Sequence, residues 1–182
     1  MKNKRKYVYL GLGSNLRSLS YGTSVNIITA STYRLRYVGL RVIKLSKIWI
    51  TSPVPYQQNP LFYNAVAKCV IINRQAFDPI KLLQGIKYIE NIMGRRKNNK
   101  SISRIIDIDI VDFKGLINNS KNLILPHPLA HLRNFVLYPI LEIDPKWSHP
   151  IIKKNVQFLI NCLSQKSRIE ITRLKKNVNI QI

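Results

Sequence analysis

Two aspartates stand two positions apart in a run of isoleucines. Asp107 and Asp109 alternate with Ile106, Ile108 and Ile110, and this alternation predicts a β-strand with one acidic and one apolar face. On such a strand both carboxylates point to the same side, with Cα atoms roughly 6.5 to 7 Å apart. Hard cations such as Mg²⁺ bind one or two carboxylates together with water and phosphate oxygens. The pair therefore indicates either a site for one or two divalent cations or a polar strand edge that faces solvent.

Basic residues gather just before this strand. Arg95, Arg96, Lys97, Lys100 and Arg104 follow one another within a short stretch. Guanidinium and ammonium groups near a carboxylate pair are the groups that hold nucleotide phosphates and their metal ions. The alternative is a solvated surface loop, because the whole chain is basic.

Other side chains with chemical potential are more isolated. His127 stands between two prolines and Arg133 follows six positions later, and each alone is as consistent with a structural role as with a catalytic one. Phe62 and Phe135 fit a hydrophobic core or the two walls of a slot for a flat ring. Residues 11–15 contain two glycines but lack the third glycine and the Lys-Ser/Thr of phosphate-binding loops, which excludes both nucleotide-loop fingerprints.

Composition limits the classes of protein to consider. The chain has 182 residues, 46% of them hydrophobic, so we expect residues 1–182 to form one domain around a single core. Lys and Arg number 30 against 8 Asp and Glu, a formal net charge of +22, which raises the question of a polyanionic partner. Ile, Asn and Lys are frequent everywhere, however, and this general bias selects no partner. We therefore expect no specific nucleic acid as the partner.

The cellular compartment is predicted from the hydrophobic runs, the N-terminal residues and the cysteines. No apolar run approaches the roughly 20 residues that cross a bilayer, and no signal peptide follows the basic first residues, so we expect no membrane association. Cys69 and Cys162 lie far apart in apolar surroundings, which predicts reduced core thiols and a cytoplasmic protein. The sequence leaves the oligomeric state open, with a monomer favoured.

Hydrophobic patterns divide the chain into elements. They predict strands at 7–12, 42–50, 62–72 and 105–113, and helices at 23–37 and 78–93. Thr23 or Ser24 is the expected N-cap of the first helix, while Asp78-Pro79 and Gly94 bound the second. The order predicts an α+β protein with a ferredoxin-like β-α-β-β-α-β core. Short helices near 135–141 and 156–163 and a basic extension at 155–182 would be C-terminal additions. The first helix would bury a side made of Val25, Ile28, Thr29, Thr32 and Leu35.

Segments spread over about residues 7–150 together resemble a known family, the 6-hydroxymethyl-7,8-dihydropterin pyrophosphokinases of folate biosynthesis. They occur in the family's order: Leu10-Gly11-Leu12-Gly13-Ser14-Asn15-Leu16, Thr51-Ser52-Pro53-Val54, Pro60 with Phe62-Tyr63-Asn64-Ala65-Val66, Ile89-Glu90, Gly94-Arg95, Arg104-Ile105-Ile106-Asp107-Ile108-Asp109-Ile110, Leu125-Pro126-His127-Pro128, and Arg133 with Phe135-Val136-Leu137 and Pro139. Each segment alone is weak, but the set in this order and spacing is specific.

The resemblance implies transfer of a pyrophosphoryl group from ATP to the hydroxymethyl group of a reduced pterin, leaving AMP. It implies that Asp107 and Asp109 hold two Mg²⁺ ions. Arg95 and Arg104 would act with them as catalytic residues at the phosphates. The nucleotide side would consist of Glu90, Lys97, Ile110, His127 and Arg133. The pterin side would consist of Thr51, Val54, Phe62, Asn64 and Phe135, with the two phenylalanines stacked on the ring and Asn64 bound to its amide edge.

Two alternatives remain open, one from departures from the family's pattern and one from the β-α-β-β-α-β order, which a common RNA-recognition domain shares. Lys97 stands where the family usually has a second arginine, and Ser101-Ile102-Ser103 replaces a common Trp-Gly-Pro. A lysine keeps the charge and loses the bidentate fork, so a catalytically degenerate relative is one alternative. The other is a basic ferredoxin-like RNA-binding module. Residues 62–68 lack the basic-Gly-aromatic signature of that module's third strand.

Overall fold

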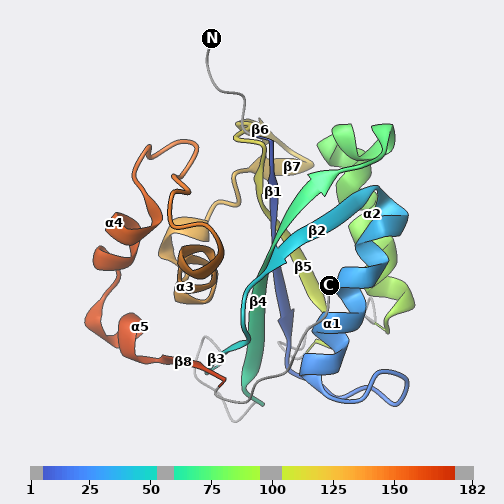
Figure 1. Ribbon diagram of the computed structural model, residues 1–182, viewed down its shortest axis with the longest axis horizontal. Helices are drawn as coiled ribbons and strands as arrows, with labels where there is room; N and C mark the ends of the chain where they lie inside the picture. The colour runs from blue at the N-terminus through green and yellow to red at the C-terminus, as the bar shows by residue number, and fades with distance from the viewer. Residues whose placement is uncertain (1–5, 53–59, 95–103, 175–182) are drawn as a thin grey trace.

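The computed structural model of the protein describes residues 6–52, 60–94 and 104–174. Within these residues a six-stranded antiparallel sheet forms the middle layer (Figure 1). Its strands are β5 (Asp107–Phe113), β1 (Val8–Ser14) and β4 (Phe62–Ile71) side by side, then β2 (Leu40–Leu45) and β3 (Trp49–Thr51), both paired with β4, and β8 (Ile171–Arg173) paired with β3. Helices pack against this sheet, so the predicted α+β class is confirmed.

Helices cover both faces of the sheet. On one face lie α1 (Ser24–Arg34) and α2 (Pro79–Ile92); on the other lies α3 (Asn134–Ile143), with α4 (Val156–Asn161) and α5 (Gln165–Ile169) beyond it (Figure 1). The connections contain 3-10 helices η1 (Leu35–Val38), η2 (Arg74–Phe77) and η3 (Ala130–Leu132) and a hairpin of β6 (Asn118–Ser120) and β7 (Leu123–Leu125). An apolar core fills each side of the sheet. Across the described segments, no helix is both long and apolar enough to cross a membrane.

The helix boundaries follow the predicted caps. Thr23 Oγ1 accepts a hydrogen bond from the Asn26 N–H, and Asp78 Oδ1 accepts one from Ile80 (2.8 Å) with Pro79 as the first helical residue. Helix α1 is shorter than predicted, because the chain tightens into η1 and turns at Gly39, where φ is +82°. A Cβ at this position would also lie 2.8 Å from the Asn73 Cβ, so only glycine fits.

The buried face of α1 differs from the predicted one. The buried residues are Ser24, Ile27, Ile28, Ser31 and Thr32, while Val25 and Thr29 are only half-buried. Ser31 Oγ donates to the Ile28 carbonyl at 2.7 Å, and this local bond satisfies the hydroxyl in the core. A hydrophobicity pattern treats serine as a surface residue, so the buried face that it predicts for α1 omits Ser24 and Ser31.

The predicted strand at 42–50 is two strands. Ser46, which is buried, separates β2 from β3: its N–H donates to the Val66 carbonyl and its Oγ accepts from the Val66 N–H, both at 3.0 Å. The side chain thus takes the place of a backbone carbonyl in the ladder with β4. The short strand β3 that results carries Thr51 at its end.

A β-bulge interrupts the alternation of β5. Leu10 of β1 lies opposite Ile110, but Tyr9 lies opposite Asp112, so Val111 is the extra residue. The bulge turns Asp112 to the same face as Asp109. There the fully buried carboxylate accepts hydrogen bonds from Trp147 Nε1 (2.9 Å) and the Gly115 N–H (2.7 Å).

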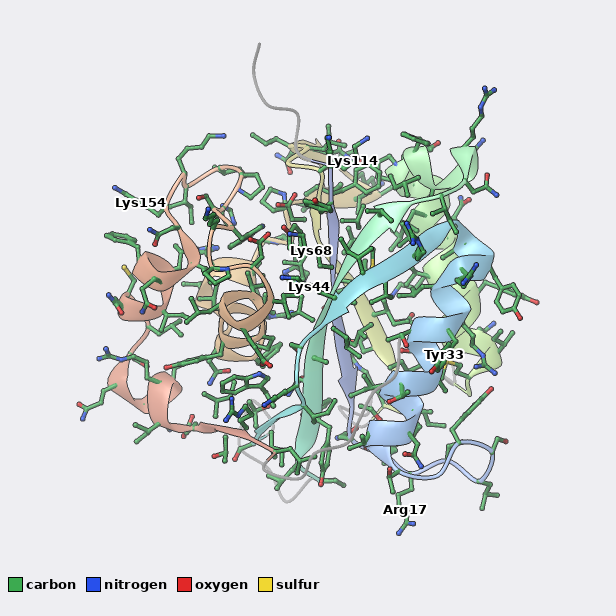
Figure 2. The ribbon with its side chains drawn as sticks, in the orientation of Figure 1. Arg17, Tyr33, Lys44, Lys68, Lys114 and Lys154 are labelled. Atoms are coloured by element: carbon green, nitrogen blue, oxygen red, sulfur yellow. The ribbon has the colours of Figure 1, made fainter. Side chains whose placement is uncertain are left out.

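Polar side chains tie the end of α3 to the sheet. Asp144, directly after α3, accepts a hydrogen bond from the Tyr9 hydroxyl and pairs with Lys68 Nζ at 2.8 Å. Lys44 Nζ donates to the Ile143 carbonyl at 3.3 Å, and Figure 2 shows both lysines reaching from the sheet toward α3. Partial burial favours a protonated Asp144, but the hydrogen bonds from Lys68 and Tyr9 outweigh it and lower the pKa of this carboxyl.

The C-terminal part holds more regular structure than the sequence indicates. A hairpin, β6 with β7, and the elements α5 and β8 lie in segments for which no element was predicted. The cysteines also differ from each other: Cys69 is buried, and burial raises the pKa of its thiol to about 12, whereas Cys162 is exposed. The prediction of two core thiols is therefore wrong for Cys162, which lies on the solvent side of the short helix α4.

Candidate active site

One end of the sheet, on the face that carries α3, is hollowed into a cavity. The predicted polar and charged residues Asn64, Arg104, Asp107, Asp109, His127 and Arg133 line it, and so do Thr51, Phe62 and Phe135. They come from β3, β4, β5, α3 and the loops beside these elements. The fold thus brings into one place side chains that are spread over more than eighty positions of the chain.

Some predicted site residues are not at the cavity. Glu90 is fully buried beneath β5, where its carboxylate accepts a hydrogen bond from the Ile108 N–H (2.7 Å) and pairs with Lys87 (2.9 Å). Ile110 lies in the apolar core on the side of α1 and α2. Val54, Arg95 and Lys97 lie outside the described residues.

Two glycines of β1 form the floor of the cavity, and sequence reasoning did not assign them a role. Gly11 lies opposite Asp109 and Gly13 opposite Asp107 in the antiparallel ladder. A Cβ on Gly11 would lie 3.4 Å from Val111 Cγ2, and one on Gly13 would lie 3.5 Å from Asn64 Oδ1. Any longer side chain would therefore extend into the cavity beside the carboxylates. The signal for their role is the pairing of β1 with β5, which places each glycine directly opposite one of the two aspartates.

Arg104 is held at the entrance of β5 by the turn that follows β1. Its N–H donates to Asn15 Oδ1 (2.6 Å), and the Asn15 N–H donates to the Arg104 carbonyl (3.1 Å). The guanidinium of Arg104 pairs with Asp107. The buried Asn15 is thus a third residue, after the two glycines, that was missed at the level of the sequence, and it fixes the backbone from which Arg104 extends.

Asp109 is surrounded by a cation and an imidazole. Arg133 Nη1 lies 3.4 Å from Asp109 Oδ2 and 3.2 Å from His127 Nε2, and His127 Nε2 is 3.7 Å from the same carboxylate oxygen. Burial, followed by the charge of Arg133, lowers the pKa of His127 despite the opposing effect of Asp109. The Leu129 N–H donates to His127 Nδ1 at 3.1 Å, while Nε2 faces both a donor, Arg133 Nη1, and an acceptor, Asp109 Oδ2.

The other half of the cavity combines aromatic rings with an amide. Phe62 on β4 and Phe135 on α3 both line it, and the guanidinium carbon of Arg133 lies 5.4 Å from the centre of the Phe135 ring. The buried Asn64 donates from Nδ2 to Thr51 Oγ1 at 3.1 Å, which fixes the orientation of its amide. An oriented amide beside aromatic side chains suits a flat heterocycle with a hydrogen-bonding edge.

The carboxylate pair fits a hard divalent cation. Among the described residues, His, Cys, Asp and Glu side chains form no group of three or more that would enclose a metal ion. Asp107 and Asp109 alone leave most of a coordination sphere to water and substrate oxygens, which is the arrangement that Mg²⁺ accepts at phosphate sites. The residues therefore suit a metal ion that arrives with a phosphate-bearing substrate.

Comparison with known proteins identifies the family. The model of 7,8-dihydro-6-hydroxymethylpterin-pyrophosphokinase (HPPK) matches residues 9–145. The chain belongs to this family. A 2-amino-4-hydroxy-6-hydroxymethyldihydropteridine pyrophosphokinase of Aquifex aeolicus is 35% identical over 147 residues, which cover 81% of this chain and 86% of the relative.

Longer members of the HPPK family also match. The folic acid synthesis protein fol1 of Pneumocystis carinii is 36% identical over 144 residues, which cover 79% of this chain, and the match spans only 18% of that relative. A Plasmodium falciparum HPPK-DHPS crystal structure with pteroate superposes with a TM-score of 0.67 at 16% identity, covering 94% of this chain and 47% of that one. At this identity the superposition shows a shared fold.

Proposed function

We propose that the protein transfers a pyrophosphoryl group from ATP to the hydroxymethyl group of 6-hydroxymethyl-7,8-dihydropterin, giving AMP and the pterin diphosphate in folate biosynthesis. The observation that carries this proposal is the single cavity in which a carboxylate pair and two arginines lie next to two phenylalanines and an oriented amide. The first set suits a metal-bound triphosphate and the second a flat heterocycle. The names of the Aquifex aeolicus and other bacterial relatives support the same reaction.

In this proposal Asp107 and Asp109 hold Mg²⁺, two ions being expected, which would neutralise charge on the triphosphate. Arg104, beside Asp107, and Arg133, beside Asp109, bind phosphate oxygens, and His127 contacts the nucleotide. Arg95 and Lys97 keep the assignments that the family resemblance implies. Glu90 and Ile110 lie away from the cavity, so they support the strand β5 rather than contact the nucleotide.

The pterin side rests on stacking and on one amide. Phe62 and Phe135 hold the ring, Asn64 binds its amide edge, and Thr51 and Val54 add backbone contacts. Catalysis then depends mainly on placing the substrate hydroxyl in line with the β-phosphorus and on neutralising the charge of the triphosphate. A strong general base is therefore not required. Positioning of this kind supplies on the order of 7 to 11 kcal/mol.

Finer expectations about the molecule belong to the same proposal. The strand order β5-β1-β4, with β2 on the far side of β4, supports a ferredoxin-like core. One domain over residues 1–182, a cytoplasmic location and a monomeric state remain predictions from the sequence.

The product of ATP tests the function directly. The purified chain is incubated with ATP, Mg²⁺ and the reduced hydroxymethylpterin, and AMP is resolved from ADP and from the pterin diphosphate. AMP that appears in equal amounts with the pterin diphosphate, and only when pterin is present, supports the proposal. ADP would indicate an ordinary kinase or ATPase. The absence of any product from a folded chain would indicate the catalytically degenerate relative.

A further inference from the structure

The C-terminal residues 164–174 lie beyond the part of the chain that the family model matches, yet they contact two elements, β3 and α3, that carry cavity residues. This segment, called the clamp below, consists of Ser164, helix α5, Glu170, strand β8 and Leu174. Figure 1 shows it running from α4 down the left side of the molecule to lie beside β3. Leu163, the residue that precedes this segment, is buried in the core between the sheet and α3 and anchors the start of the clamp.

The first contact of the clamp is with β3. Thr51 lies opposite Ile171, Ile50 opposite Thr172 and Trp49 opposite Arg173. The Leu174 N–H donates to the Ile48 carbonyl at 2.9 Å. Leu174 and Ile48 therefore form a hydrogen-bonded pair of the antiparallel ladder. Because such pairs recur at every second position, Thr172 and Ile50 form the next one. The clamp therefore holds β3 from its outer edge.

This contact continues into the cavity. Thr51, the last residue of β3, lines the cavity, and its Oγ1 accepts the hydrogen bond that orients Asn64. The strand has only three residues, so its inner pairing with β4 offers few hydrogen bonds to fix it. The position of the Asn64 amide thus depends on a strand that β8 borders on the other side.

The second contact of the clamp is with the start of α3. Asn134 Nδ2 donates to the Ser167 carbonyl of α5 at 2.6 Å, and Asn134 Oδ1 accepts from the Phe135 N–H at 2.6 Å. Asn134 is buried, and Arg133, at the N-cap position, makes no side-chain capping bond, since a guanidinium has no acceptor for a backbone N–H. The link from Asn134 to Ser167 therefore fixes the first turn of α3, which carries Phe135.

Trp49 of β3 links the clamp to α3. This residue is opposite Arg173 on β8, its indole lies 5.5 Å from the Tyr138 ring of α3, and its Nε1 donates to Glu142 at 3.0 Å. Strand β3, helix α3 and the clamp thus contact one another in pairs.

From these contacts we infer that residues 164–174 position the pterin half of the active site, with Asn134 and Thr172 as the positioning residues. The inference rests on the proposed function and adds to it a segment outside the family match. The clamp holds Thr51, and through it Asn64, on one wall and Phe135 on the other. It touches neither the carboxylate pair nor Arg104 in any contact described, so its effect is directed to the pterin rather than to ATP.

Two substitutions in the full-length chain test the inference. Asn134→Asp replaces the donor to Ser167 with an acceptor and keeps the oxygen that caps Phe135. Thr172→Pro removes the N–H that pairs with β3; Thr172→Ala, at an exposed side chain, is its matched control. The affinity of pterin is measured in the presence of a non-hydrolysable ATP analogue, alongside the affinity of the analogue alone, kcat, and the melting temperature.

We expect Asn134→Asp and Thr172→Pro to weaken pterin binding about five- to tenfold, which is the size of effect that packed elements transmit between sites. The affinity of the ATP analogue should stay within about twofold of wild type. Thr172→Ala should match wild type. Hydrogen exchange should rise at the amides of residues 49–51 in Thr172→Pro only. Variants that lose melting temperature but keep pterin affinity would overturn the inference, as would equal losses for both substrates.

Failure of the proposed function gives a different result. In that case the wild-type chain itself makes no AMP from ATP and pterin. Hydrogen exchange still decides whether β8 holds β3: the clamp is overturned if exchange at residues 49–51 is the same in Thr172→Pro and Thr172→Ala.

Discussion

At the level of single residues, cations of the chain already neutralise both carboxylates of the proposed metal site. Arg104 pairs with Asp107, and Arg133 with Asp109. A triphosphate with Mg²⁺ would replace both partners at once, because guanidinium groups bind phosphate oxygens well and carboxylates prefer the hard cation. Substrate binding would therefore exchange one set of ion pairs for another, so that neither carboxylate is left without a partner.

The carboxylate pair gives the first prediction. Asp107→Asn and Asp109→Asn should each lower kcat by roughly 10² to 10³, about 3 to 4 kcal/mol, because an amide binds Mg²⁺ poorly. Turnover of ATP to AMP is the measurement. Asp78→Asn is the control, since it removes one carboxylate and keeps the helix cap of α2. Near-normal turnover in both active-site variants would exclude the metal assignment.

The aromatic pair gives the second prediction. Phe62→Ala and Phe135→Ala should weaken pterin binding by about 1 to 3 kcal/mol through lost stacking and burial, and leave ATP affinity nearly unchanged. Titration calorimetry with each ligand separates the two effects. Phe77→Ala removes an exposed phenylalanine away from the cavity and should change neither affinity. A loss of ATP affinity instead would mean that the two substrates are assigned to the wrong halves.

At the level of elements, α3 is fixed at both ends by different means. Its end is tied to the sheet through Asp144, Lys68 and Tyr9, and its beginning to the clamp through Asn134. Lys68 also lies over the ring of Tyr7, with its Nζ 4.0 Å from the ring centre. A helix held in this way keeps Phe135 at a constant distance from the sheet that carries Phe62.

The pKa of Asp144 gives the third prediction. A carboxyl whose pKa is lowered on folding stabilises the protein above its unfolded pKa, about 3.8, and loses that contribution as pH falls through the lower folded value. The free energy of unfolding should therefore fall between about pH 5 and pH 2, and fall less in Asp144→Asn. At pH 7 the variant should be destabilised by about 1 to 3 kcal/mol. Urea unfolding at several pH values measures both. Identical pH profiles for the two proteins would contradict the role of the ion pair.

Much of the element order was predictable, and the reasons for the errors are local. Alternation and capping residues identified β1, α1, β4, α2 and β5 because these elements are long or carry strong end signals. The division at Ser46 was not predictable, since a serine that substitutes for a backbone carbonyl leaves no pattern in hydrophobicity. Strand β8 was missed for a related reason: its three residues gain their structure from β3.

The site shows the same division. Asp107 and Asp109 could be placed on one face from their spacing, because side-chain direction in a strand depends on the neighbouring residues alone. The positions of Gly11 and Gly13 opposite them could not be predicted, because they depend on which distant strand pairs with β5 and in which register. Asn134 was missed for the same reason, as its partner Ser167 lies on another helix.

At the level of the whole molecule, the net charge of +22 raises the question of whether ATP is held by a specific site or by a general field. The two contributions differ in range. A field from many surface lysines is screened within about 10 Å at ordinary salt, whereas a contact in a partly buried site is screened much less. Charge removal near and far from the cavity therefore distinguishes them.

Arg104 and Lys154 give the fourth prediction. Arg104→Ala should lower kcat by roughly tenfold or more, because its guanidinium would stabilise the transferring phosphates. Lys154→Gln, at the far edge of the molecule in Figure 2, should change kcat by less than about twofold. Steady-state kinetics at two salt concentrations provide the comparison. Equal losses in both variants at low salt would favour the general field.

The pairing of distant segments has a consequence for synthesis of the protein. Gly13 of β1 pairs with Asp107, and Thr51 of β3 pairs with Ile171 near the end of the described chain. Contacts between residues on the order of 100 positions apart form slowly, because loop closure precedes any gain from pairing. While the chain leaves the ribosome, β3 lacks its outer neighbour until β8, residues 171–173, has been translated. The half of the cavity that carries Asp107 and Asp109 is thus able to assemble on the nascent chain before the half that carries Thr51.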